Sequence, residues 1–182
     1  MSGHSKWSQI KHQKAATDAK RSKAFGKLAR VITIAARDKG SDPAMNASLR
    51  MAIEKARAAN MPQDNIERAI KKGAGGGGEE ALQEFIYEAY GPGGTALIIT
   101  GITDNNNRTS HEIKHLISEH GAKWANPGSV LWAFEKKDNE WVAKEYSEVT
   151  LTPEDTDALY KLMEIIDEHD DVQEITANNK DA

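Results

Sequence analysis

One stretch of the chain has the spacing of a zinc hydrolase. The residues His111-Glu112-Ile113-Lys114-His115 spell His-Glu-x-x-His, which on a helix offers two zinc ligands and a carboxylate as general base. After His115 the chain supplies His120 rather than the Gly and later His that extended forms of this motif require. We therefore predict solvated side chains on a surface helix, with no metal, no cofactor and no enzyme activity. Zinc hydrolysis by this motif stays as an alternative.

The first third of the chain carries a different chemistry, which is cations placed to meet phosphate. Residues 1–72 hold 16 Lys and Arg against 6 Asp and Glu, whereas residues 73–182 hold 8 against 22. The net charge of −4 therefore hides a basic segment of the kind that contacts nucleic acid. We expect phosphate contacts from the cations of this segment, and base stacking or anchoring of the arm from its tryptophan: Lys6, Trp7, Lys11, Lys14, Lys20, Arg21, Lys23, Lys27 and Arg30.

A second polar group follows a predicted strand and precedes a predicted helix. Asn105, Asn107, Arg108 and Thr109 can cap that helix or bind an anion at its N-terminus. Capping is the simpler interpretation.

Composition removes several classes of protein. The chain has no cysteine, which excludes disulfide frameworks, zinc ribbons and thiol catalysis. No apolar run approaches the ~18 residues that cross a bilayer. The basic start favours Lys over the Arg and Ser of organelle transit peptides. We expect a cytoplasmic monomer that does not contact a membrane.

Helices are expected to position the basic residues. Apolar spacing and end signals predict one helix from Thr17 to Lys39, a second capped by Asp42 with Met45 on its buried side, and a third over Pro62–Lys72. Residues 1–16 form a basic arm with too little apolar periodicity to predict order. We predict an N-terminal domain, residues 1–72, made of this arm and a three-helix core.

A glycine tract marks the domain boundary, so we assign residues 73–80 to a linker. Beyond it, residues 81–182 alternate between strand and helix patterns. The order from residue 95 onward is strand, helix, strand, strand, helix, strand, which is the split βαβ arrangement of the ferredoxin-like fold. The predicted fold is α+β, a three-helix domain followed by a ferredoxin-like antiparallel α/β sandwich with an extra leading strand. The strands and helices of the second domain are expected at residues 84–90, 95–103, 108–120, 129–135, 140–150, from Pro153 onward, and 172–176.

Long motifs in both domains resemble one known family. They include Met1-Ser-Gly-His-Ser-Lys-Trp7, Pro62-Gln-Asp-Asn-Ile-Glu-Arg-Ala-Ile-Lys-Lys-Gly73, Tyr90-Gly-Pro-Gly-Gly94, Asn107-Arg108-Thr109 and Asp170-Asp171-Val172-Gln173. Through these motifs the chain is similar to the YebC family over nearly its whole length.

The resemblance implies a non-enzymatic regulator of gene expression. Bacterial members are described as DNA-binding transcriptional regulators of the cytoplasm. Mitochondrial relatives look like translational activators of cytochrome oxidase subunit synthesis, and bacterial relatives have been linked to relief of ribosome stalling at proline runs. Family members usually carry a further α/β domain between the strand that ends near Phe134 and the strand that leads to the last helix, where this chain has only residues 135–140. The sequence is therefore similar to a short member of the family.

The target polymer stays open at this stage. No helix-turn-helix spacing is legible, and the predicted sheet lacks the paired aromatics of an RNA recognition motif. We predict a nucleic-acid-binding regulator that acts through its basic N-terminal domain on DNA, on ribosomal RNA, or on both, with the ribosome as a possible partner. A protein-interaction adaptor without nucleic acid is the alternative.

Overall fold

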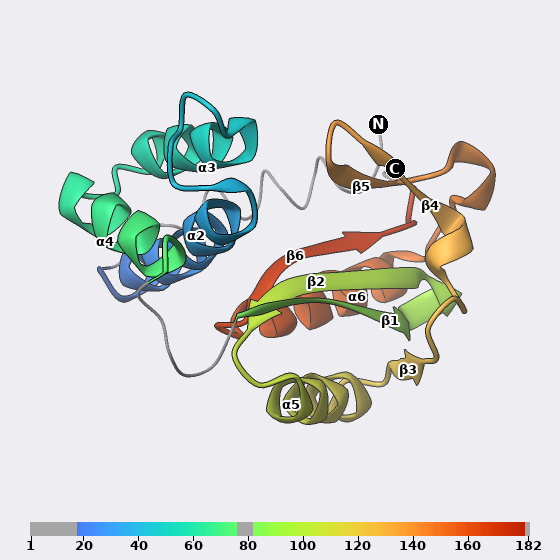
Figure 1. Cartoon of the computed structure of the whole chain (residues 1–182). Coiled ribbons are helices and arrows are strands. Elements are labelled where there is room, and N and C mark those ends of the chain that lie inside the picture. The colour runs from blue at the N-terminus through green and yellow to red at the C-terminus, as the bar shows by residue number, and fades with distance from the viewer. Residues whose placement is uncertain (1–17, 76–81, 181–182) are drawn as a thin grey trace. The chain divides into compact units, whose positions relative to one another are not determined.

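The computed structural model of the protein describes residues 18–75 and 82–180 (Figure 1). These residues divide into two compact units. The helical unit contains the helices up to Gly73 together with residues 102–105, and the α+β unit contains most of the strands and the later helices. The predicted arm, residues 1–16, and most of the predicted linker, residues 73–80, lie outside the described ranges.

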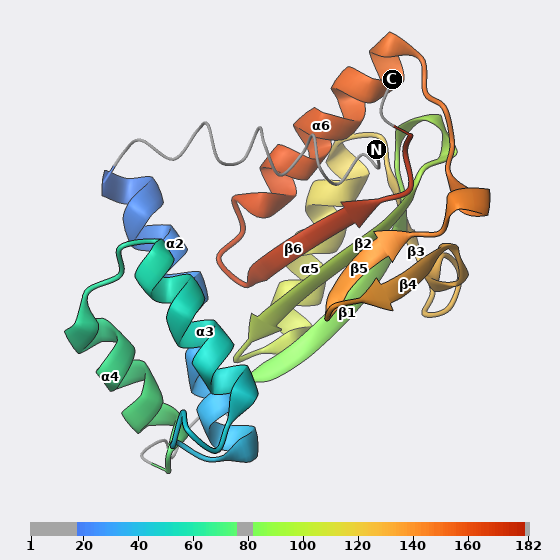
Figure 2. The ribbon, with the colours of Figure 1, turned by 90° about the horizontal axis from the view of Figure 1, so that it is seen from above.

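The helical unit is built from α2 (Asp18–Lys39), α3 (Ala47–Ala58) and α4 (Gln63–Gly73), and α2 packs against both others (Figure 2). The apolar spacing along the first helix predicts its core side correctly, because Ile32 and Ala36 are buried and Phe25 and Leu28 pack against them. The helical core also takes side chains from α3, α4 and the loop between them: Leu49, Ala52, Ile53, Ala56, Met61, Ile66 and Ala69.

Gly73 ends α4 in close contact with α2. A Cβ at this position would collide with the carbonyl oxygen of Thr33 and crowd the Cβ of Ala36. The Thr33 hydroxyl donates to the carbonyl of Ala69, 3.1 Å away, and so bridges the two helices. The glycine that the sequence assigns to a helix stop is therefore also a packing residue.

The start of α3 corrects one prediction. The cap is Asn46, whose side-chain oxygen accepts from the Leu49 amide at 3.0 Å, and the helix does not begin at Asp42. The Asn46 amide group also donates to the carbonyls of Ala35 and Gly40, each at 2.7 Å. Asp42 instead closes a turn by accepting from the Ala44 amide at 2.9 Å. Met45, predicted to be buried, is 85% exposed.

The α+β unit contains a four-stranded sheet in the order β3-β1-β2-β6. Its strands are β1 (Gln83–Tyr90), β2 (Ala96–Thr103), β3 (Lys123–Ala125) and β6 (Val172–Ala177). Helices α5 (Asn106–Glu119) and α6 (Pro153–Asp167) cover one face of the sheet and form a hydrophobic core with it (Figure 2). The predicted α+β class is confirmed, and the leading strand β1 lies inside the sheet, between β3 and β2.

The other face of the sheet is covered by a hairpin. Strands β4 (Phe134–Lys137) and β5 (Glu140–Ala143) pair only with each other among the described residues, and Phe134 packs with Ile98 in a second core. Because side chains alternate along a strand, β2 contributes Leu97 and Ile99 to one core and Ile98 to the other.

Two predicted strands are shorter than expected. Residues 129–133 form a loop and the short 3-10 helix η2 (Leu131–Ala133), because the buried carboxylate of Glu88 accepts the amides of Val130 and Leu131 at 2.7 and 2.9 Å. The strand from Glu140 ends at Ala143, and the 3-10 helix η3 (Glu145–Ser147) follows. The short strand β3 was not predicted.

Candidate nucleic-acid interface

Helix α2 carries the predicted cations that fall within the described residues. Lys20, Lys23, Lys27 and Arg30 are separated by three, four and three positions, so they follow one side of the helix, away from the apolar side that contains Ile32. We call these four residues the basic stripe. The remaining predicted contacts, Lys6, Trp7, Lys11 and Lys14, lie outside the described residues.

The cations along α2 differ in their surroundings. Lys20 is exposed, whereas Lys23, Lys27 and Arg30 are half-buried. Arg30 donates from one guanidinium nitrogen to the carbonyl of Ile102 at 3.0 Å. Arg21 lies on the flank of the stripe and pairs with Asp18 at 3.5 Å, and both side chains are largely exposed. An exposed pair of this kind contributes little to stability, so Arg21 can exchange its carboxylate for a phosphate at small cost.

A groove of about 480 Å³ in the helical unit extends the candidate surface. It runs along α2 and α4, and two cations of α4 that the sequence analysis did not single out, Arg68 and Lys72, line it together with Arg30. Their four-residue spacing on a helix was a signal that could have found them. The groove also contains apolar and acidic side chains, among them Phe25, Met61 and Asp104.

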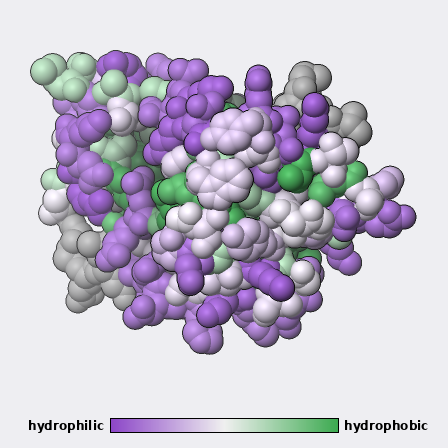
Figure 3. Space-filling model, turned by 90° about the vertical axis from the view of Figure 1, so that its right-hand side faces the viewer, coloured by the Kyte–Doolittle hydropathy of each residue, from purple (hydrophilic) through white to green (hydrophobic). Residues whose placement is uncertain are grey.

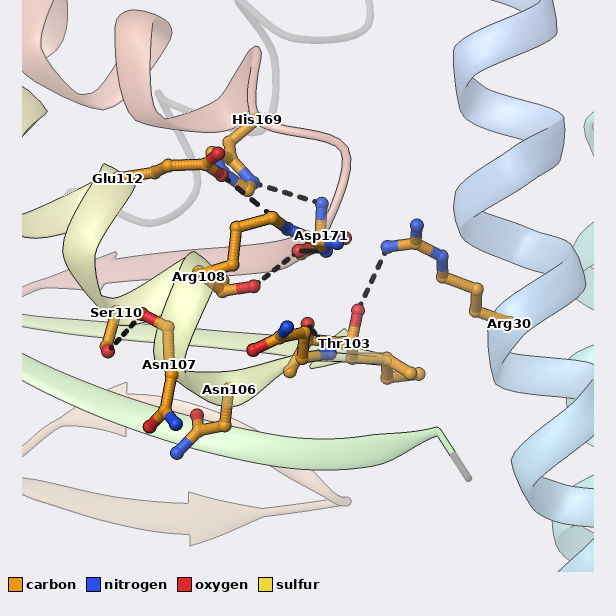
Figure 4. Close-up of polar contacts among 12 residues, drawn as sticks. Arg30, Thr103, Asn106, Asn107, Arg108, Ser110, Glu112, His169 and Asp171 are labelled. Carbon is orange, nitrogen blue, oxygen red and sulfur yellow. Dashed lines mark hydrogen bonds and ion pairs between the residues drawn. The ribbon is translucent and has the colours of Figure 1, made fainter. Parts of the chain in front are cut away.

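The polar residues at the start of α5 serve the protein's own interior (Figure 4). Arg108 and the Thr109 hydroxyl both donate to one oxygen of Asp171, at 2.9 and 2.5 Å. Asp171 is only 2% exposed, so these two bonds compensate a buried carboxylate. The cation and the hydroxyl that an anion site would need are therefore occupied by a carboxylate of the chain.

The neighbouring asparagines form hydrogen bonds within local turns and to a side chain of strand β1. The backbone amide of Asn105 donates to the Thr103 hydroxyl at 2.9 Å, and the backbone carbonyl of Asn107 accepts from the Ser110 hydroxyl at 3.1 Å. The Tyr87 hydroxyl, from β1, donates to the side-chain oxygen of Asn106 at 2.5 Å. Burial, aided by the negative charge of Asp171, raises the pKa of Tyr87 above its usual value of 10.0, and a bond to Ser110 opposes the rise.

The His-Glu-x-x-His motif lies on α5, and its glutamate, Glu112, contacts residues outside the motif. The Glu112 carboxylate is hydrogen-bonded to Nε2 of His169 at 2.8 Å, and it lies 3.9 Å from the guanidinium of Arg108. Figure 4 labels all three residues. His115 pairs with Glu119 at 3.3 Å. Within residues 18–75 and 82–180, no group of three or more His, Cys, Asp or Glu side chains is placed to hold a metal ion. None of the helices in these ranges is long and apolar enough to cross a membrane.

Comparison with known families covers both units. Residues 5–76 match the family model described as the TACO1/YebC protein N-terminal domain, and residues 82–139 match the model described as the TACO1/YebC second and third domain. The chain belongs to the TACO1/YebC family.

Individual proteins of known sequence or structure are also similar to this YebC-family chain. A protein of Thermosipho melanesiensis named "Probable transcriptional regulatory protein" is 50% identical over 99% of the chain and 71% of its own length. A Petrotoga mobilis protein of the same name is 57% identical over 80% of the chain and 58% of its own length. The crystal structure of a conserved hypothetical protein, Aq1575, from Aquifex aeolicus is similar with a TM-score of 0.84 and 33% identity over 96% of both chains.

This YebC-family chain has a tight hairpin at β4 and β5 and covers only part of the length of its relatives. The match to the second and third domain ends at residue 139, within the turn between β4 and β5. Asp138 and Asn139 form that turn with φ of 50° and 68°, the left-handed conformation that tight hairpins use. This two-residue turn joins β4 directly to β5. The matches cover 58% of the Petrotoga protein and 71% of the Thermosipho protein.

Proposed function

We propose that this protein is a non-enzymatic, nucleic-acid-binding regulator of gene expression that contacts its target through the helical unit. The observation that carries the proposal is the basic stripe on α2, together with Arg68 and Lys72 in the adjoining groove. Residues 18–75 hold 13 Lys and Arg against 6 Asp and Glu, so this unit attracts phosphate even without the arm. The names of the Thermosipho and Petrotoga relatives agree with a role in gene regulation.

We further propose that the contact reads the backbone of a structured nucleic acid and not a base sequence. Lysines dominate the stripe, and lysine binds phosphate as a point charge without the paired bonds that identify a base edge. Ribosomal RNA offers many closely spaced phosphates of this kind, so a ribosome-associated role in the cytoplasm follows. The protein acts there as a monomer.

A second candidate, regulation of transcription through DNA, is favoured by the relatives' names. Under this candidate the same cations hold the protein on duplex DNA, and sequence preference comes from elsewhere in the complex. The two candidates share the basic stripe and differ in the polymer recovered with the protein.

The experiment is a salt series of binding to a ribosomal RNA fragment and to a DNA duplex of equal length, measured by fluorescence anisotropy. The triple variant Lys20→Glu, Lys23→Glu, Lys27→Glu should bind on the order of 100-fold more weakly at 0.1 M salt, with a salt slope lower by about 3. A matched control reverses three exposed lysines of the α+β unit, Lys114, Lys161 and Lys180, and so makes the same change in net charge. Equal loss in both variants would show that net charge alone is sensed and would contradict the proposal.

A further inference from the structure

The α+β unit exposes aromatic side chains on one surface. Tyr90 is 41% exposed, Trp132 is 58% exposed and Tyr146 is 77% exposed, although each comes from a different element: β1, η2 and η3. Figure 3 shows the side of the molecule where β4 and β5 lie in Figure 1, and its centre is pale and green between purple margins. Large exposed aromatics that gather in one place mark interaction sites more often than single exposed residues do.

Hydrogen bonds link two of the rings, and a lysine connects the third to the backbone of Trp132. The Tyr90 hydroxyl and the indole nitrogen of Trp132 both donate to the carbonyl of Ser129, at 3.3 and 3.0 Å. Lys144 donates to the carbonyl of Trp132 at 2.8 Å, and its ammonium group lies 5.8 Å from the ring centre of Tyr146. We call Tyr90, Trp132 and Tyr146 the aromatic platform.

The backbone that carries the platform is held from beneath. Glu88, 4% exposed, accepts the amides of Val130 and Leu131 immediately before Trp132. The Ser147 hydroxyl, next to Tyr146, donates to the carbonyl of Ala133 at 2.7 Å. Because the indole N–H of Trp132 is already bonded, the exposed ring surface offers a partner apolar and π contacts at a low cost in ordering.

The excess of acidic side chains around the platform favours a cationic partner. Residues 132–148 contain five acidic and three basic side chains, and one of those bases, Lys144, is bonded to the Trp132 carbonyl. The α+β unit as described, residues 84–101 and 106–180, holds 18 Asp and Glu against 8 Lys and Arg. A phosphate backbone would be repelled by this unit, whereas arginine and lysine side chains would be attracted by its carboxylates. Aromatic faces also attract cations, and Lys136 already lies 5.2 Å from the ring centre of Trp141 on the same hairpin.

We propose that the aromatic platform docks a cationic, arginine-rich segment of a protein partner. Guanidinium groups stack on Trp132 and Tyr146, and exposed carboxylates beside them, such as Glu145, pair with the remaining cations. The site is separate from the proposed nucleic-acid contact, because it uses other residues on the other unit.

The test uses the full chain and a fluorescent peptide of five Arg-Gly-Gly repeats, with a Gln-Gly-Gly peptide as the neutral reference. The double variant Trp132→Ala, Tyr146→Ala leaves the net charge unchanged and should weaken binding of the arginine peptide about tenfold. The single variant Tyr146→Ala, at the most exposed ring, should show part of that loss without disturbing the Ser129 bonds. A control variant, Met45→Ala with Met51→Ala, removes exposed apolar side chains of the helical unit and should bind as the wild type does.

Three results would overturn the proposal. Equal binding of the arginine peptide by the wild type and both platform variants would show that only overall charge is sensed. Loss of binding to a poly-uridine oligonucleotide, with the arginine peptide unaffected, would assign the rings to base stacking. Self-association of the wild type that the double variant abolishes, with no effect on the peptide, would make a second copy of the chain the occupant.

Discussion

The helical unit and the α+β unit differ in the chemistry of their surfaces. The described part of the helical chain, residues 18–75, has more than twice as many basic as acidic side chains, and residues 82–180 have the reverse excess. The exposed large aromatics belong to the second unit, whereas the exposed apolar side chains of the first are methionines. Opposite charge in one chain favours two different partners, with phosphate on the helical unit and a cationic partner on the α+β unit.

Each unit has a hydrophobic core of its own, so we expect a substitution in one unit to change mainly the stability of that unit. Three of the four tryptophans, Trp124, Trp132 and Trp141, belong to the α+β unit. Tryptophan fluorescence therefore follows mainly the unfolding of that unit, and circular dichroism follows the helices of both. Variants in one unit should change one signal more than the other.

The largest expected effect is the loss of the buried carboxylate. Asp171→Ala removes the buried carboxylate that accepts from the guanidinium of Arg108 and the hydroxyl of Thr109, and should lower the free energy of unfolding of the α+β unit by about 3 kcal/mol. Urea unfolding followed by tryptophan fluorescence measures the change. The neighbouring exposed residue provides the control, since Asp170→Ala should cost far less. A similar loss in both variants would contradict the role assigned to Asp171.

The next largest effect is a difference in stability between alanine substitutions at two glycines of the helical unit. Gly73→Ala forces a Cβ against the Thr33 carbonyl and should cost about 2 kcal/mol, because α4 must move away from α2. Gly26→Ala, in the middle of α2, meets no atom within 4 Å and should stabilise the helix by about 0.5–1 kcal/mol. Thermal unfolding followed by circular dichroism should shift in opposite directions for the two variants. A shift in the same direction would show that the close approach of the two helices is not as described.

A smaller effect tests which residue begins α3. Asn46→Ala removes the cap and two bonds to the end of α2, and should cost about 1–2 kcal/mol. Asp42→Ala removes one exposed turn bond and should cost a few tenths. Chemical unfolding of both variants under the same conditions decides between them, and the reverse ranking would return the cap to Asp42.

The smallest effect is an alkaline pH dependence in the α+β unit. The pKa of Tyr87 is raised in the folded protein, so the folded state favours the neutral phenol. This contribution is fully present below pH 10.0 and is lost as the pH rises through the folded value. Unfolding free energies measured from pH 8 to 11 should fall less steeply for Tyr87→Phe than for the wild type. Parallel curves would remove Tyr87 as the cause.

Local patterns in the sequence were enough for the regular elements. The apolar spacing along α2 and Pro153 at the start of α6 act within a few residues, so these two helices appear close to their predicted bounds. The misses depend on distant residues. Asn46 became the cap because it also reaches Ala35 and Gly40, and residues 129–133 left the strand conformation because Glu88, some 40 positions earlier, takes their amides.

The candidate site was predictable to a similar degree. Charge counting identified α2, and helix geometry places its cations along one side. The four-residue spacing of Arg68 and Lys72 is a local signal, whereas their place in the groove depends on how α4 packs against α2. The aromatic platform likewise depends on tertiary structure, because its rings come from three separate elements and are linked through Ser129 and Lys144.

The most direct test of the central claim is ultraviolet crosslinking in growing cells, followed by sequencing of the DNA and RNA attached to the protein. We predict crosslinks concentrated in ribosomal RNA that are lost when Lys20, Lys23 and Lys27 are changed to Glu, and that persist when Trp132 and Tyr146 are changed to Ala. Discrete promoter DNA peaks with the same dependence on the lysines would keep the basic stripe and select the transcriptional role. Crosslinks that persist in the lysine variant would contradict the assignment of nucleic-acid binding to the basic stripe.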